Sequence, residues 1–184
     1  MKEIEVKFKI ADSDYDTVKS ILEKHLTSKE KSQRDDVFLL PEQIGKPIIA
    51  GSKIYRIRTV EVDGIKKSLF TLKVQTEKPL VSDEYEFEIA DTQTARKALL
   101  ASGLQKRVTV QKTRIEGEIH QYNLCLDEVA GLGVFIELEL MSQDDDVDIN
   151  KIQKDMSNLL KMLGLQGEIC LIPYDTQLEN LKKK

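Results

Sequence analysis

The stretch Glu3-Ile4-Glu5-Val6-Lys7-Phe8-Lys9-Ile10 alternates strictly between charged and apolar residues. A period of two sends successive side chains of a β-strand to opposite faces. One face of this strand is therefore apolar and packs against a core, while the other carries two carboxylates followed by two ammonium groups. Such a pattern in a single strand is typical of a solvated outer face. Its meaning depends on whether other strands repeat it.

Seven further segments have the character of strands, and helical patterns lie between them. Strands are predicted over 33–40, 53–58, 67–75, 84–89, 108–117, 121–129 and 134–141. The Asp63-Gly64 pair predicts a tight hairpin between the third and fourth strands. Helices are predicted over 12–26, 91–102 and 149–163, with a short one after Pro173. Asp12 or Ser13 would cap the first helix and Asp91 the second.

Two segments are predicted to lie outside the helices and strands. The segment 41–52, which contains Pro41 and Pro47, is predicted to be a loop. The acidic run 144–146 is predicted to be a solvated lead-in to the third helix, because acidic residues favour helix N-termini.

Several of these strands carry a face that is almost purely charged. An ordinary exposed sheet face would mix in Ser, Thr and Gln, whereas the faces opposite these charges are mostly apolar. The polar faces hold eight acids, Glu3, Glu5, Glu84, Glu86, Glu88, Asp127, Glu137 and Glu139, and seven bases, Lys7, Lys9, Arg56, Arg58, Lys73, Lys112 and Arg114.

Two architectures accommodate this pattern. In the first, the sheet closes with its helices outside and its charges inside. In the second, a two-layer sheet exposes a salt-bridged face to solvent, where ion pairs contribute little. A charged interior costs several kcal/mol for each unpaired ion, about an order of magnitude more than a surface ion pair is worth. The near balance of acids and bases nevertheless allows it. Two divalent cations on the carboxylates would make the lining net positive and suited to a triphosphate.

Composition narrows the class of protein. The chain has 184 residues, of which 40% are apolar and 33% are charged, and is predicted to form one domain over 1–184. No window resembles a signal peptide or a membrane span. A net charge of −4 argues against a general nucleic-acid binder. Cys125 and Cys170 lie far apart and fit no metal-ligand spacing, so a reduced, cytoplasmic setting is expected.

The motifs, taken in order, resemble those of the CYTH family, the triphosphate tunnel metalloenzymes. Glu3-Ile4-Glu5-Val6-Lys7 matches the ExExK signature with which the family opens. Further matches are Tyr55-Arg56-Ile57-Arg58, Phe70-Thr71-Leu72-Lys73, Glu84-Tyr85-Glu86 and Lys112-Thr113-Arg114. The most specific match is Leu126-Asp127-Glu128-Val129-Ala130-Gly131-Leu132-Gly133 followed by Phe135-Ile136-Glu137-Leu138-Glu139.

The resemblance implies an α+β fold, a closed eight-stranded antiparallel β-barrel with helices packed outside, which binds a triphosphate with Mg²⁺ or Mn²⁺. It assigns phosphate binding to Lys7, Arg56, Arg58, Lys73, Lys112 and Arg114, of which Lys7, Lys73 and Arg114 are the expected catalytic residues. It assigns metal binding to Glu3, Glu5, Glu137 and Glu139, with Glu84, Glu86 and Asp127 as supporting acids. The implied partner is a small-molecule triphosphate rather than nucleic acid or membrane, and a homodimer is left open.

The chain most resembles the class IV adenylyl cyclase branch, through its Gly-Leu-Gly turn and its size. It departs from the family at Val37, where a tyrosine is frequent, at Val74-Gln75, where Gly-Pro often follows the strand lysine, and at Ser82, where an arginine is frequent. Three functions stay open: conversion of ATP to cyclic AMP and pyrophosphate, hydrolysis of thiamine triphosphate, inorganic tripolyphosphate or a nucleoside triphosphate, and binding of polyphosphate or nucleotide without turnover.

Overall fold

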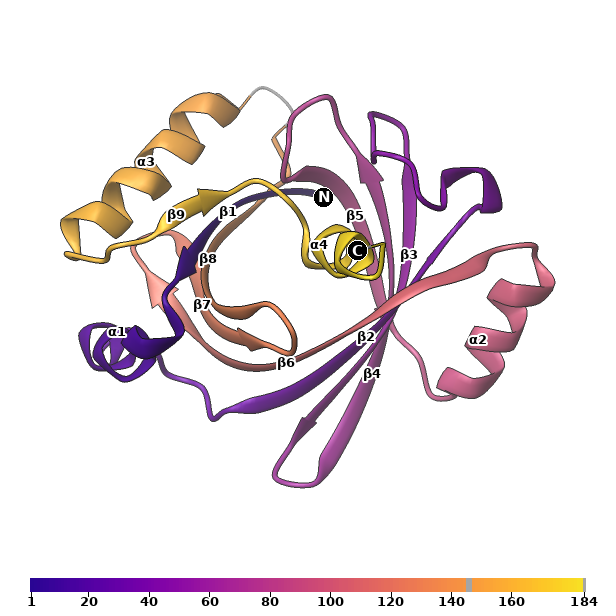
Figure 1. The fold of residues 1–184 in the computed structure, drawn as a ribbon, viewed down its shortest axis with the longest axis horizontal. Coiled ribbons are helices and arrows are strands. Elements are labelled where there is room, and N and C mark those ends of the chain that lie inside the picture. Colours follow the sequence, from indigo (N-terminus) through magenta and orange to yellow (C-terminus); the bar gives the residue numbers. More distant parts are fainter. Residues whose placement is uncertain (145–146, 184) are drawn as a thin grey trace.

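A computed structural model describes residues 1–144 and 147–183 of the chain. Within these ranges the chain forms nine strands and four α-helices, with two short 3₁₀ segments, η1 and η2 (Figure 1). In chain order the elements are β1 (Lys2–Ile10), η1 (Asp12–Asp14), α1 (Tyr15–Leu22), β2 (Lys31–Leu39), η2 (Pro41–Gln43), β3 (Lys53–Val62), β4 (Ile65–Gln75), β5 (Val81–Glu88), α2 (Thr92–Ala101), β6 (Gln105–Ile119), β7 (Tyr122–Val129), β8 (Gly133–Ser142), α3 (Ile149–Met162), β9 (Glu168–Cys170) and α4 (Tyr174–Leu181).

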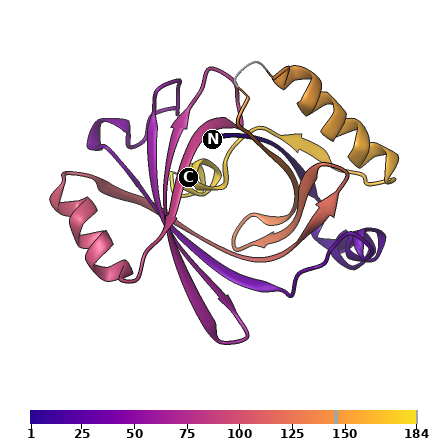
Figure 2. The ribbon, with the colours of Figure 1, turned by 180° about the vertical axis from the view of Figure 1, so that it is seen from behind.

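Eight strands close into a barrel. They form one antiparallel sheet in the order β5-β4-β3-β2-β6-β7-β8-β1, and β5 pairs again with β1 through Glu3 and Ser82. Figures 1 and 2 show this ring from opposite sides, with α1, α2 and α3 outside it. The predicted closed eight-stranded antiparallel β-barrel is confirmed, and the alternative of a two-layer sheet is wrong.

The barrel closes through a short seam, which a ninth strand extends. β5 pairs with β1 only over Lys2–Ile4. Farther along the same edge, β9 pairs with β1 over Lys7–Lys9. The sequence analysis did not predict β9, because three residues are too few to establish a period of two.

The apolar face of β1 builds the main core. Ile4, Val6, Phe8 and Ile10 are each 2% exposed or less. The last three pack with buried residues of α1 and α3, among them Leu22. Burying a side chain of this size contributes about 1.5–3 kcal/mol. This core lies outside the barrel, so the charged face of β1 must point inward.

Of the four α-helices in the described residues, α2 and α3 begin with a side-chain cap, and α1 and α4 do not. Asp91 caps α2, its carboxylate accepting hydrogen bonds from the backbone N–H groups of Gln93 (2.9 Å) and Thr94 (3.1 Å). The predicted first helix is shorter than expected, because 12–14 form η1 and α1 ends at Leu22. The prediction that Asp12 or Ser13 caps it is wrong. Asp12 instead accepts a hydrogen bond from the backbone N–H of Val134 on β8 (3.1 Å).

Helix α4 is held at one end of the barrel by a buried arginine. Arg107 of β6 contacts Asp175 and Glu179 of α4, the latter at 2.8 Å. Figure 1 shows α4 within the outline of the ring. Its first residue, Tyr174, packs on the inward-facing Phe135 with the ring centroids 4.9 Å apart. The C-terminal helix therefore contributes a side chain to the barrel interior.

The remaining sequence predictions concern the loops and the acidic run. The Asp63-Gly64 turn joins β3 to β4 with both residues at positive φ, as a type I′ hairpin requires. The acidic run 144–146 falls largely outside the described residues. In the described part of the chain, no helix combines the length and apolar character needed to cross a membrane.

Candidate functional site

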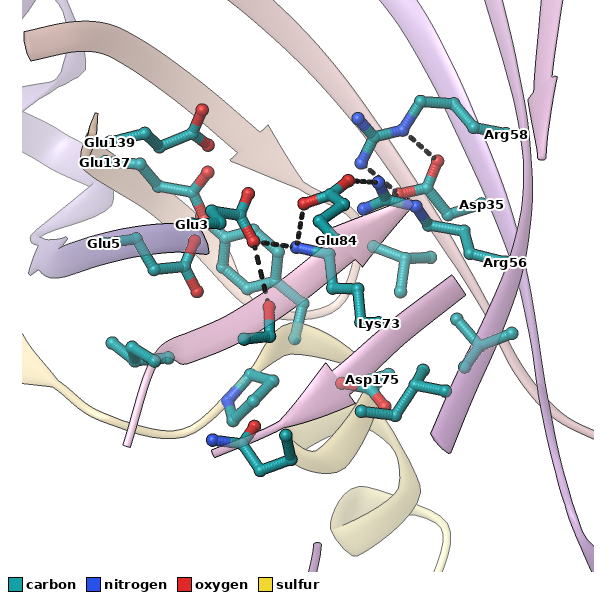
Figure 3. A pocket seen from close by; sticks show the side chains of 18 of the residues that line it. Glu3, Glu5, Asp35, Arg56, Arg58, Lys73, Glu84, Glu137, Glu139 and Asp175 are labelled. Atoms are coloured by element: carbon teal, nitrogen blue, oxygen red, sulfur yellow. Dashed lines mark hydrogen bonds and ion pairs between the residues drawn. The ribbon is translucent and has the colours of Figure 1, made fainter. Parts of the chain in front are cut away.

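The inward faces of the strands surround one cavity of about 480 Å³. Figure 3 shows Glu3, Glu5, Glu137 and Glu139 on one side, Arg56 and Arg58 with Asp35 on the other, and Lys73 and Glu84 between them. The charged residues that line it are Glu3, Glu5, Lys7, Asp35, Arg56, Arg58, Lys73, Glu84, Glu86, Lys112, Arg114, Glu137, Glu139 and Asp175. Every predicted site residue except Asp127 is in this lining, so strands far apart in sequence meet here as expected.

Three of the predicted metal ligands converge. One carboxylate oxygen each from Glu3, Glu5 and Glu139 can be chosen so that all lie within 4.8 Å of one another. Glu5 and Glu139 are direct register partners on β1 and β8, and Glu3 follows two residues away on the same face. The fourth predicted ligand, Glu137, is the register partner of Lys7.

The carboxyl groups of this cluster differ in pKa because their surroundings differ. Burial raises the pKa of Glu139 to about 8, and the neighbouring Arg114 only partly opposes this. Burial also acts on Glu3, but the ammonium group of Lys73 outweighs it and lowers the pKa of Glu3 to about 2. At neutral pH, Glu3 is therefore ionised, while Glu139 holds a proton that a cation would displace.

Lys73 and Arg56 connect the carboxylate side of the cavity to its basic side. The Nζ atom of Lys73 contacts Glu3 and lies 3.2 Å from Oε2 of Glu84. Nη2 of Arg56 lies 3.1 Å from Glu84 and 3.3 Å from Glu86. Glu84 is therefore shared by two cations.

Arg58 is paired with a residue that the sequence analysis missed. Its Nε and Nη2 atoms donate to the two carboxylate oxygens of Asp35, both at 2.9 Å. Such two-pronged pairing fixes the plane of the guanidinium. Arg56 reaches the same carboxylate at 3.9 Å. Because Arg56 and Arg58 lower its pKa, Asp35 stays ionised despite being buried.

Lys7 lies between two carboxylates and beneath an aromatic ring. Its ammonium group contacts Glu5, lies 3.2 Å from Oε1 of Glu137 and lies 5.2 Å from the ring centroid of Tyr174. The lysine side chain is 5% exposed. Burial alone would lower its pKa, but Glu137 and Glu5 raise it, so Lys7 remains charged.

Asp127 lies behind the lining and holds two of the predicted phosphate-binding residues. It is completely buried, accepts hydrogen bonds from Nε (2.6 Å) and Nη2 (2.7 Å) of Arg114, and accepts another from Lys112 (2.7 Å). The phenol of Tyr174 donates to the same carboxylate at 3.2 Å. Asp127 therefore orients two cations toward the cavity without lining it.

Three inward residues were missed for identifiable reasons. Asp35 lies on β2, where the sequence Gln33-Arg34-Asp35-Asp36-Val37 does not alternate cleanly. Thr71, which is fully buried and accepts from Arg56 (3.1 Å), carries no charge to mark it. Tyr174 lies on a helix, and no strand pattern could predict its place. The one sequence feature that could have indicated Asp35 is that it shares a face of its strand with Gln33 and Val37.

Two of the three departures from the family pattern, Val37 and Ser82, lie at the cavity. Val37 lines the cavity and packs in an apolar cluster with Tyr174, so a tyrosine from α4 lies near the position where the family often has one. Ser82 is buried and its hydroxyl donates to Glu3 at 3.4 Å.

Two charges expected on the inner faces lie outside the cavity. The side chain of Glu88 is 63% exposed and pairs with Lys67 at 3.0 Å. The side chain of Lys9 turns away to contact the backbone carbonyl of Leu132 and is 37% exposed. Both residues lie at the end of their strands, where alternation no longer guarantees an inward position.

The corrected interior is formally negative and fits a divalent cation. Apart from Asp175, which is paired with Arg107, it holds eight acids, Glu3, Glu5, Asp35, Glu84, Glu86, Asp127, Glu137 and Glu139, against six bases, Lys7, Arg56, Arg58, Lys73, Lys112 and Arg114. With all of these groups ionised, the excess of two negative charges equals the charge of one divalent ion. Carboxylate oxygens are the ligands that Mg²⁺ and Mn²⁺ prefer.

Comparison with known proteins identifies the family. The model of the CYTH domain matches residues 1–168. The chain therefore belongs to the CYTH family.

Individual relatives share the fold at low identity. An adenylate cyclase, CyaB, of Aeromonas hydrophila is 25% identical over 167 residues, which cover 90% of this chain and 82% of that protein. The PH1819 protein of Pyrococcus horikoshii OT3 superposes with a TM-score of 0.80 at 23% identity, covering 99% of each chain. A putative adenylyl cyclase from Hippeastrum, HpAC1, whose structure is described as revealing a dominant triphosphatase activity, superposes with a TM-score of 0.66 at 16% identity, covering 98% of this chain and 95% of that one.

Proposed function

We propose that this chain is a divalent-metal-dependent enzyme that binds a triphosphate in its central cavity and converts ATP to cyclic AMP and pyrophosphate. The observation that carries the proposal is the division of the cavity, in which three convergent carboxylates face a set of cationic side chains. Such a division matches a metal-bound triphosphate, whose oxygens need cations and whose metal needs carboxylates.

Within this proposal each wall has a separate task. Glu3, Glu5 and Glu139 would hold Mg²⁺ or Mn²⁺, which when bound would neutralise charge on the phosphate oxygens. Glu137, the fourth predicted ligand, would join them if Lys7 moved onto the phosphates. Arg58, fixed by Asp35, would bind phosphates at the opposite side, and Lys73, which contacts Glu3 and Glu84, would bind them between the two sides.

The basic residues would also stabilise the leaving group. When the ribose 3′-hydroxyl oxygen attacks the α-phosphorus, its proton leaves to solvent, the bond from that phosphorus to the oxygen of the β-phosphate breaks, and negative charge develops on pyrophosphate. Lys7, Lys73 and Arg114 are the cations assigned to that charge. Carboxylate partners hold Lys73 and Arg114 in place before substrate binds, so these two need little reorganisation, whereas Lys7 would move from Glu137 onto the phosphates.

Hydrolysis of a triphosphate is the second candidate, and the same cavity favours it for a different reason. Its charged centre can hold three phosphates whether or not a base is attached. Attack by water on the terminal phosphorus would use the same cations. The description of the Hippeastrum protein joins the two activities in one relative. The cavity is also lined by apolar residues, among them Val37, Ile48, Ile54 and Met141. These would provide a surface for a nucleobase, which favours a nucleotide substrate over inorganic tripolyphosphate.

Product analysis separates the candidates. Purified protein is incubated with ATP, thiamine triphosphate or tripolyphosphate, with Mg²⁺ and then Mn²⁺, and the products are resolved by chromatography. Cyclic AMP with pyrophosphate supports the cyclase, whereas release of inorganic phosphate supports the triphosphatase. A rise in melting temperature with tripolyphosphate but no turnover supports the binding protein. No product and no thermal shift at saturating ligand would refute all three.

We also propose that the chain works in the cytoplasm. Both of its cysteines are free, and one of them is buried inside the barrel. A free thiol is the usual state in a reducing compartment. Fractionation of the cells that make the protein tests this assignment.

A further inference from the structure

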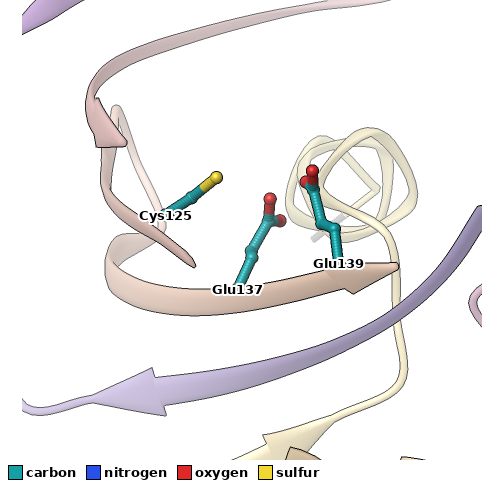
Figure 4. Close-up of side chains that lie close together, drawn as sticks. All are labelled: Cys125, Glu137 and Glu139. Carbon is teal, nitrogen blue, oxygen red and sulfur yellow. The ribbon is translucent and has the colours of Figure 1, made fainter. Parts of the chain in front are cut away.

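A second group of potential metal ligands lies beside the three carboxylates. Figure 4 shows Cys125, Glu137 and Glu139 with their side chains pointing toward one another. One ligand atom from each, with the sulfur of Cys125 included, lies within 4.8 Å of the others. Cys125 and Glu137 are direct register partners on β7 and β8, and Glu139 follows Glu137 on the same face. Pairing and alternation therefore hold this group in place.

The sulfur of Cys125 lies among charged groups and interacts electrostatically with Arg114, Glu137 and Glu139. Cys125 is 2% exposed, and among the described residues no hydrogen bond engages its sulfur. Its neighbours on β7, Leu124 and Leu126, face the opposite way, into the core under the helices. Cys125 instead shares the inward face with Asp127. It is thus a buried polar side chain directed at two carboxylates rather than into apolar packing.

The two ligand groups differ in chemistry although they share Glu139. The group of Glu3, Glu5 and Glu139 offers only oxygen, which suits Mg²⁺ and Mn²⁺. The group of Cys125, Glu137 and Glu139 adds sulfur, which favours Zn²⁺ and other thiophilic ions. We propose that Cys125, Glu137 and Glu139 form a second metal position, selective for thiophilic divalent cations, adjacent to the all-carboxylate position.

The dimensions of the group allow such a site after small side-chain movements. Zinc bonds sulfur at about 2.3 Å and carboxylate oxygen at about 2.0–2.2 Å, so tetrahedral ligand atoms lie roughly 3.5 Å apart. The three ligand atoms now lie up to 4.8 Å apart and would have to approach one another to bind the ion. Rotation of a glutamate side chain provides a movement of about this size. Three protein ligands leave a fourth position for water or another oxygen ligand.

The nearby arginine does not preclude a cation. The guanidinium of Arg114 is held by the two oxygens of Asp127, at 2.6 and 2.7 Å, although Lys112 shares that carboxylate. Arg114 also contacts Glu137 and lies 3.5 Å from Glu139, and Lys7 lies 3.2 Å from Glu137. A bound ion would therefore displace Arg114 from both glutamates and compete with Lys7 for Glu137. The thiol proton would leave to solvent when the metal–sulfur bond forms.

This proposal shares Glu139 with the proposed function, but it is tested by absorbance, without any measurement of turnover. Co²⁺, which mimics Zn²⁺, gives a thiolate-to-cobalt charge-transfer band in the near ultraviolet only when sulfur is bound. The protein, freed of metals and kept reduced by a phosphine, is titrated with Co²⁺. The chain has two cysteines, so Cys125→Ser is the test and Cys170→Ser the matched control. Wild type and Cys170→Ser should show the band with a one-to-one end point, and Cys125→Ser should lack it.

A further variant tests the carboxylate in a protein that keeps the thiol. Glu139→Gln should raise the dissociation constant for Co²⁺ by about 10–100-fold, as expected for loss of one ligand interaction. Excess Zn²⁺ should abolish the band, and an equal concentration of Mg²⁺ should not. Circular dichroism checks that each variant is folded. If Cys125→Ser does not fold, the Co²⁺ affinity of Glu139→Gln tests the proposal instead. No band at saturating Co²⁺, a band that survives in Cys125→Ser, or a dissociation constant unchanged in Glu139→Gln would overturn the proposal.

Discussion

Replacement of Lys7 by Met tests the charged interior most directly. The methionine keeps most of the side-chain volume but removes the ammonium group that contacts Glu5 and lies 3.2 Å from Glu137. Both carboxylates are then left without this cation in a buried site. Removing one partner of a buried ion pair costs about 3–5 kcal/mol. We expect Lys7→Met to lower the free energy of unfolding at pH 8 by about 3 kcal/mol, since Arg114 still contacts Glu137.

The cost of this substitution should depend on pH with a definite sign. Burial already raises the pKa of Glu5 against the effect of Lys7, and Lys7 helps Lys112 and Arg114 to hold the pKa of Glu137 low, so removal of Lys7 shifts both pKa values upward. A carboxyl group of this kind is most destabilising when ionised, so the penalty grows as pH rises and shrinks as the group takes up a proton. Urea unfolding of wild type and Lys7→Met at pH 5 and pH 8 should therefore give the smaller difference at pH 5.

Lys9 provides the control on the same strand. Its side chain is 37% exposed and lies 3.6 Å from an exposed aspartate, so Lys9→Met should cost less than about 1 kcal/mol. Binding of tripolyphosphate with Mg²⁺, measured by calorimetry, should weaken about 10–150-fold in Lys7→Met, which corresponds to the 1.5–3 kcal/mol of one charge-assisted contact. Lys9→Met should bind nearly as wild type does. Equal and small effects of both substitutions would refute the assignment of Lys7 to a phosphate-binding interior.

Two further predictions concern other parts of the site. Glu139, whose pKa is raised to about 8, binds its proton more tightly folded than unfolded, so it should make the metal-free protein less stable as pH rises from about 4.5 to about 8. The melting temperature should fall less across this range in Glu139→Gln, and identical slopes would contradict the assigned shift. Arg107→Met should undock α4 by removing the buried contacts to Asp175 and Glu179. Hydrogen exchange of 174–181 should rise by at least tenfold while that of β1 stays unchanged, and Lys183→Met should leave both alone.

The alternation of charge allowed most of the site to be predicted from sequence. A period of two determines which face each residue occupies, so Glu3, Glu5 and Lys7 could be placed together without coordinates. The same rule placed further residues on the charged faces of their strands, namely Arg56, Arg58, Lys73, Glu137 and Glu139. It worked because each of these strands has one apolar face that must pack under a helix, and a shift by one residue would bury the charges in that core.

The residues that escaped prediction depend on contacts between distant segments. Tyr174 enters the barrel only because Arg107 holds α4 against β6. Asp35 was hidden because its neighbour Asp36 is also buried, on the outside, where Arg96 and Lys106 pair with it. Both aspartates look alike in sequence, and only the closed sheet determines which one faces Arg58.

The position of β1 in the sheet has a consequence for the synthesis of the protein. Its hydrogen-bonding partners are β8, β5 and β9, so most of its edge stays open until Gly133–Ser142 has left the ribosome. During that interval Ile4, Val6, Phe8 and Ile10 have no core to join. Open apolar strands of this kind are sites of aggregation, and interspersed charges are what suppresses it. The same glutamates and lysines that line the finished cavity therefore keep the nascent strand from pairing with the wrong chain.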